Sequence, residues 1–183
     1  MTGAHDDPAL LLRDFVNTYD VEPGTDHVST PELLAEWLAG RGLVSAGTTA
    51  TGDDLATATA LREGLREAMA AHHSRRDADL PDELEDALAA LPLRVTLTGG
   101  APRLVPLDPP ATAAGGLARL AAAIPASAAA GTWPRLKVCK EGTCRWAFLD
   151  TSKNRSRAWC SMSVCGNRTK TRAYRARRRP PAG

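Results

Sequence analysis

Four cysteines close together near the carboxyl end constrain this chain more than any other feature. Cys139, Cys144, Cys160 and Cys165 follow the spacing C-x4-C-x15-C-x4-C. Two short pairs separated by a medium loop suit a tetrahedral zinc site, because each tight turn supplies two thiolates and the loop returns the chain to complete the set. Four cysteine ligands leave no open coordination position, so the spacing predicts one structural zinc ion and argues against catalysis at the metal.

Two other uses of the cysteines depend on the compartment. Two disulfides would need an oxidising environment, and a redox pair usually has two intervening residues and no reason to be doubled. The start "MTGAHDDPALLLRDF" lacks the positive charge of a secretion signal, and no stretch approaches the roughly 18 uncharged apolar residues of a membrane span. We therefore expect a cytoplasmic, nucleoid-associated protein that does not contact a membrane.

The formal charge is divided sharply along the chain. Residues 1–132 hold nine arginines, no lysine and 19 acidic residues, whereas residues 133–183 hold 14 lysines and arginines and only two acidic residues, Glu141 and Asp150. Aromatic content and cysteine use change at the same place. We predict two domains, with 1–132 as a regulatory, ligand-sensing or dimerisation module and 133–183 as a metal-stabilised module that meets a polyanion.

The larger part has mixed helical and strand patterns. Apolar spacing predicts helices at 8–19, 31–40, 52–75 and 81–91. Thr30 and Pro31 form a clear start signal for the second helix. The period then changes to two over 93–107 around Gly99-Gly100, which predicts a β-hairpin, and a last helix should be broken or bent at Pro125. The fold class is therefore α+β, a mixed helical domain with a hairpin or small antiparallel sheet.

Between the cysteine pairs, "CRWAFLDTSKNRSRAWC" predicts a second hairpin. Trp146 and Phe148 would share one face of its first strand, and Arg155 and Arg157 one face of its second. The aromatic side chains could form a mini-core around the metal or stack on bases.

A basic helix should follow the hairpin. Ser161 or Ser163 can cap a helix that runs to about Arg178 and holds Cys165 in its first turn, where free backbone N–H groups stabilise thiolate sulfur. A knuckle, a hairpin and a helix carrying the last ligand is the layout of a treble-clef finger.

This helix carries a stripe of basic side chains that suits phosphate contacts. The candidate nucleic-acid contacts are Arg155, Arg157, Asn167, Arg168, Lys170, Arg172, Arg175 and Arg179. We expect Arg168 and Arg172 to lie nearest a DNA groove. RNA and an acidic protein remain alternative partners, and a solvated charged surface is the simplest alternative.

Three polar residues of the larger part need an interpretation. Asn17 lies on an otherwise apolar helix, so its amide should either bond a loop or contact a small-molecule effector. His72 and His73 are expected on a helix surface. No Ser/His/Asp set, phosphate loop or carboxylate pair stands out, so we predict a protein without enzymatic activity. A homodimer through the larger part would lengthen the small DNA site that one finger reads.

Two segments resemble known families. "CSMSVCGNRTKTRAYRARR", with "DTSKNRSRAWCSM" before it, resembles the CGNR zinc finger, named for the tetrapeptide that begins at Cys165. "RDFVNTYD" and "TPELLAEWLAGRGL" resemble the ABATE domain that commonly precedes this finger. The resemblance implies a mixed α and β first domain, a treble-clef finger, and a role as a bacterial stress-responsive transcription regulator that binds DNA.

Overall fold

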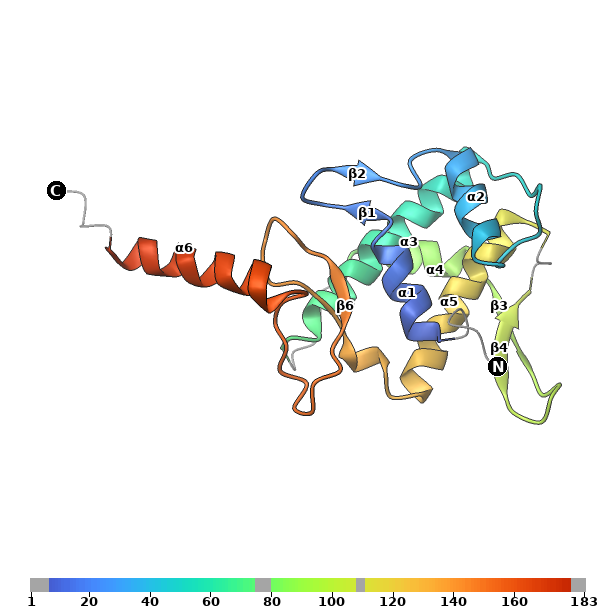
Figure 1. The fold of residues 1–183 in the computed structure, drawn as a ribbon. Coiled ribbons are helices and arrows are strands. Elements are labelled where there is room, and N and C mark those ends of the chain that lie inside the picture. The colour runs from blue at the N-terminus through green and yellow to red at the C-terminus, as the bar shows by residue number, and fades with distance from the viewer. Residues whose placement is uncertain (1–6, 75–79, 108–110, 179–183) are drawn as a thin grey trace.

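The computed structural model describes residues 7–74, 80–107 and 111–178 (Figure 1). Its elements, in chain order, are α1 (Pro8–Val16), β1 (Tyr19–Asp20), β2 (Thr25–Asp26), α2 (Pro31–Gly40), α3 (Gly52–Ala71), α4 (Asp82–Ala89), β3 (Leu93–Thr96), β4 (Arg103–Pro106), α5 (Ala113–Ala129), the 3-10 turn η1 (Trp133–Arg135), β5 (Leu136–Val138), β6 (Ala147–Leu149), the π-helical turn η2 (Met162–Gly166) and α6 (Asn167–Arg178). The predicted α+β class is confirmed. No helix among these elements combines the length and apolarity needed to cross a bilayer.

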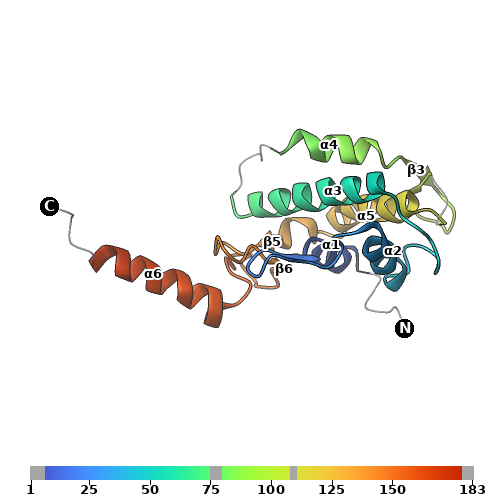
Figure 2. The same cartoon turned by 90° about the horizontal axis from the view of Figure 1, so that it is seen from above.

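Local capping signals explain where the helices begin. Thr30 accepts a hydrogen bond from the Leu33 amide at the start of α2, as predicted. Thr51 and Asp54 form a reciprocal capping box at the start of α3. From above, α4, α3 and α1 lie in successive layers (Figure 2), and the leucines that face between them are buried. Burial of these apolar faces stabilises the layers.

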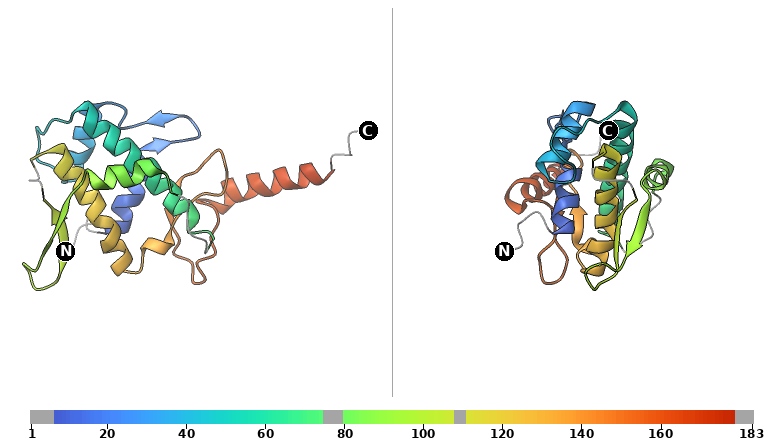
Figure 3. Two further views of the ribbon diagram at one scale, coloured as in Figure 1. Left: turned by 180° about the vertical axis from the view of Figure 1, so that it is seen from behind. Right: turned by 90° about the vertical axis from the view of Figure 1, so that its right-hand side faces the viewer.

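The predicted β3–β4 hairpin is confirmed. Leu93 pairs with Pro106 and Thr96 with Arg103, and the hairpin packs on α5 at the end of the molecule opposite α6 (Figure 3). The break offered for Pro125 is wrong, because α5 continues from Ala113 to Ala129 through this residue, and the bend offered as the alternative stays a prediction. Proline removes one backbone donor, and the packing of the small, buried alanines of α5 outweighs that loss.

The hairpin predicted between the cysteine pairs is also wrong. β6 pairs instead with β5, with Leu136 opposite Leu149, so the first cysteine pair lies at the tip of this hairpin. The segment predicted as its partner strand is a loop held by Asp150, whose carboxylate accepts hydrogen bonds from the amides of Ser152 and Arg157. Arg155 has a φ of 50°, which a strand does not allow.

The hairpin β5–β6 belongs to the core of the larger part. Leu136, Val138 and Ala147 are buried in one cluster with the apolar side chains of α1, α3 and α5. α1 lies beside β6, and α3 lies beside β5 (Figure 1). The two regions that differ so strongly in charge therefore share a core across the predicted boundary at 132.

Asn17 joins α1 to β6. Its Nδ2 donates to the Ala147 carbonyl at 2.9 Å, and its Oδ1 accepts from the Ala147 amide at 2.8 Å. The Asn17 amide is therefore satisfied at both ends, and its partner is a strand residue where the sequence suggested a loop.

We expect Asn17→Ala to destabilise the folded protein by about 1–3 kcal/mol, because it leaves a buried amide and a carbonyl of Ala147 without partners. Urea unfolding of the zinc-loaded chain measures this change. Asn154→Ala, in an exposed loop, is the control and should unfold like the wild type. Equal stability of both variants would contradict the role given to Asn17.

Candidate metal centre and basic helix

The four cysteines come together at the junction of the β5–β6 hairpin and α6. Their Sγ atoms all lie within 4.8 Å of one another, and the Sγ atoms of Cys144 and Cys165 each lie 3.7 Å from that of Cys160. Ligands of a tetrahedral site with Zn–S bonds of about 2.3 Å are about 3.8 Å apart, whereas a disulfide needs about 2.05 Å. The four cysteines therefore form a site for one structural zinc ion and are not paired as disulfides.

Two tight turns position the thiols. The first follows β5, where the amides of Cys144 and Arg145 donate to the Glu141 carbonyl. The second is η2, whose start is capped by Ser161, one of the two serines offered by the sequence, through the Val164 amide. Cys165 lies in this turn, ahead of α6, and not in the first turn of the basic helix as predicted. Burial raises the pKa of the Cys144 thiol to about 11, so a zinc ion must displace the proton of this thiol when it binds.

Both acidic residues of the carboxyl-terminal region are buried inside it. The Glu141 side chain has no exposed surface and accepts hydrogen bonds from Thr169 at 3.0 Å and Arg172 at 2.8 Å. The hydrogen bond from Arg172 lowers the pKa of Glu141, although burial opposes it. Glu141 lies between the first two ligands, so it fixes α6 to the metal turn.

Asp150 holds the loop that follows β6. The Lys137 ammonium lies 2.8 Å from its Oδ2 and also donates to the Arg155 carbonyl. Burial acts to raise the pKa of Asp150, but the hydrogen bonds from Lys137 and Ser152 together hold it well below its usual range. Because the carboxylates of both Glu141 and Asp150 are buried, the charged side chains on the surface of this region are basic.

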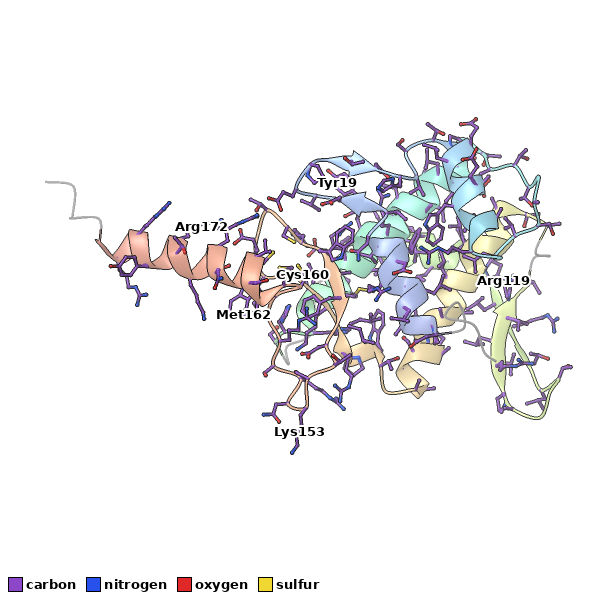
Figure 4. All side chains as sticks on the ribbon, viewed as in Figure 1. Tyr19, Arg119, Lys153, Cys160, Met162 and Arg172 are labelled. Atoms are coloured by element: carbon purple, nitrogen blue, oxygen red, sulfur yellow. The ribbon has the colours of Figure 1, made fainter. Side chains whose placement is uncertain are left out.

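Helix α6 extends away from the rest of the molecule, as two perpendicular views show (Figures 1 and 2). Two of its predicted contact residues face back toward the body: Arg168 pairs with Glu22 of the β1–β2 hairpin at 2.8 Å, and Arg172 pairs with Glu141. Arg172 nevertheless keeps 61% of its side chain exposed. Figure 4 labels it on the extended helix. Lys170 and Arg175 are exposed, and no ion pair holds either one among the described residues.

The remaining predicted contacts differ in their surroundings. Arg155 is exposed on the loop, and Asn167 is exposed at the start of α6, where its amide donates to the Ser163 carbonyl. Arg157 is half-buried, lies over the Phe148 ring at 4.9 Å and donates to the carbonyls of Trp159 and Cys160. Its guanidinium therefore braces the zinc loop. Arg179 lies outside the described residues.

Two protein families match the chain. Residues 9–136 match ABATE, described as "Putative stress-induced transcription regulator", and residues 135–178 match the CGNR zinc finger. The chain belongs to the ABATE family. Both families are of regulatory or zinc-finger type. A comparison with curated proteins finds no match.

The glycine of the CGNR finger lies under two side chains. A Cβ at Gly166 would stand 2.6 Å from Sδ of Met162 and 3.5 Å from the Trp159 ring. The backbone at Gly166 is therefore packed closely against the finger's own side chains.

Several residues that join the ABATE part to the finger were not found from the sequence. Arg66 is buried on α3 and donates to the carbonyls of Val16 and Arg145. His72 and His73 are half-buried, not surface residues as predicted, and their ring nitrogens lie 2.7 and 2.6 Å from the carbonyl oxygens of Leu136 and Val138. Burial lowers the pKa of both imidazoles. In the sequence, the sign of such a contact was the charged Arg66 among the apolar residues that face the core from this helix.

Proposed function

We propose that this protein is a zinc-dependent DNA-binding regulator of transcription, in which the metal sets the direction of α6 and the helix contacts duplex DNA. The observation that carries the proposal is a 12-residue basic helix that extends from the body while both acids of its region are enclosed. Its apolar content is too low for a core-facing stripe.

The dimensions and charge of α6 suit a groove of DNA. An α-helix with its side chains is about 10–12 Å wide, and the major groove of B-DNA is about 12 Å wide. Basic side chains that reach phosphates release condensed counterions, which favours binding at low salt. A helix of this length is marginal alone in water, so a polyanion would also stabilise it.

The two sides of α6 have different roles in this proposal. Arg168 and Arg172 orient the helix through Glu22 and Glu141. The outer side chains at 167, 170, 174 and 177 follow helical spacing on the side away from those carboxylates, and Arg175 lies one turn beyond Arg172. Lys170 lies on this outer side, whereas Arg175 lies on the same side as Arg168 and Arg172. Both are exposed and neither has an ion pair among the described residues, so they are the clearest candidates for phosphate contacts. Substitution of Arg172 would instead leave the buried Glu141 without its cation.

Genome-wide crosslinking in the native host tests this proposal. We expect enriched DNA sites for the wild type and a strong reduction for Lys170→Gln/Arg175→Gln, because two phosphate contacts are lost. Lys153→Gln/Arg103→Gln removes the same charge from exposed residues on a finger loop and on β4, and it should crosslink like the wild type. Crosslinking to RNA without DNA enrichment would favour an RNA-binding adaptor.

A further inference from the structure

A cavity of about 890 Å³ lies where the ABATE part meets the zinc finger. One wall comes from α1 and α2 and includes Arg13, Trp37 and Arg41; the other comes from β6 and the zinc loop and includes Trp146 and Arg157. Its volume is in the range of small-molecule sites, which also commonly lie between domains. Asn17, whose sequence context suggested an effector contact, lines the cavity as well.

The ionisable side chains of the cavity carry an excess of positive charge. Arg13, Arg41 and Arg157 are opposed by one carboxylate, Asp14. Asp14 accepts from Nε and Nη2 of Arg13 and, at 2.6 Å, from Nη1 of Arg41. Nη1 of Arg13 and Nη2 of Arg41 do not bond Asp14. Two fixed guanidinium groups with donors to spare are suited to a carboxylate, because planar forks of N–H groups match its two oxygens.

Aromatic rings supply the rest of the lining. Trp37, Trp146 and Phe148 line the cavity, and the Arg41 guanidinium lies 5.2 Å from the centre of the Trp37 ring. Flat aromatic surfaces favour a flat apolar body through stacking and burial of area. We propose that this cavity binds a small aromatic carboxylate, with its acid group at Arg13 and Arg41 and its ring among the aromatic side chains.

Such a ligand would touch both parts of the molecule at once. The β6 wall is bound to α1 through Asn17, and Arg157 in the same wall donates to the carbonyl of the zinc ligand Cys160, which also lines the cavity. Occupancy therefore stabilises the finger in its place against the ABATE part, because binding favours the state that contains the complete site. The inference rests on this cavity and does not depend on DNA binding.

The test uses the zinc-loaded full chain without nucleic acid and two probes of the same shape, 2-naphthoate and the uncharged 2-naphthamide. In calorimetric titrations, naphthoate should bind with one site per chain and naphthamide about 10-fold to 100-fold more weakly, because only the acid accepts charged hydrogen bonds. In NMR spectra, the indole N–H signals of Trp37 and Trp146 should shift. The signal of Trp133, which does not line the cavity, should stay.

Matched arginine variants locate the acid group. Arg41→Gln should weaken naphthoate binding about 10-fold or more and leave naphthamide unchanged, and Arg13→Gln serves as a second variant if Arg41→Gln unfolds. Arg94→Gln, on the exposed face of β3, is the control. Equal affinity for both probes, no binding of naphthoate, or naphthoate binding that Arg41→Gln and Arg13→Gln leave unchanged would each overturn the proposal.

Discussion

Loss of zinc is expected to unfold the carboxyl-terminal finger and to expose part of the main core. Structural zinc contributes about 10–16 kcal/mol to small finger peptides at neutral pH, and this finger has few other apolar contacts. Its local cluster consists of Cys139, Cys144 and Cys165 with partly buried Trp146, Trp159 and Cys160. Because β5 and β6 also pack on α1 and α3, the effect should extend into the ABATE part.

Cys165→Ser tests this expectation without a chelator. The wild type should contain one zinc ion per chain, and the variant much less, with loss of helical circular dichroism from α6 and a changed tryptophan emission. Ser163→Ala, an exposed position in the same turn, is the control and should keep its zinc. A folded Cys165→Ser protein with an intact α6 would contradict the structural role of the metal.

Lys137→Met should cost about 3–5 kcal/mol of stability, the usual effect of removing one partner from a buried ion pair. Only 4% of the Lys137 side chain is exposed and none of Asp150, so the remaining carboxylate would lie in the interior without its cation. Lys140→Met, at the next lysine of the chain, changes an exposed side chain and should have little effect.

Lowering the pH should reduce the difference in unfolding free energy between the wild type and Lys137→Met. The pKa of Asp150 is lowered in the folded protein, so its contribution to stability is complete above the ordinary aspartate pKa of about 3.9 and is lost as the pH falls toward the folded value. In Lys137→Met the unpaired carboxylate takes up a proton at a higher pH. Urea unfolding between neutral and acidic pH should therefore show the two proteins converging. A constant difference would indicate that lost packing, and not the ion pair, destabilises the variant.

Local signals were sufficient for much of the fold. The start of α2 at Thr30, the β3–β4 hairpin and the cap at Ser161 each depend on residues close in sequence, and all three are confirmed. The cysteine spacing likewise predicted a four-thiolate cluster, because each pair is formed by one turn.

The errors arose where distant contacts decide the conformation. The basic residues of segment 150–157 occupy every second position, as on one face of a strand. The Asp150 carboxylate, however, accepts hydrogen bonds from the Ser152 and Arg157 amides and from Lys137, and these bonds hold the segment as a loop. Nothing in the spacing showed that β6 would pair with β5 or that Asn17 would bond Ala147. The basic stripe on α6 was visible, yet its sequence could not show that Arg168 and Arg172 have carboxylates beside them. Partners far apart in the chain leave no periodic signal.

Salt-dependent binding of the zinc-loaded chain to a short DNA duplex tests the central claim most directly. The logarithm of the binding constant should fall linearly with the logarithm of the salt concentration. Each phosphate contact contributes about 0.9 to the magnitude of this slope, so Lys170→Gln/Arg175→Gln, which removes two contacts, should make the slope correspondingly shallower. Cys165→Ser should abolish the binding. No duplex binding by the wild type, or an unchanged slope in the double variant, would contradict a DNA-contacting α6.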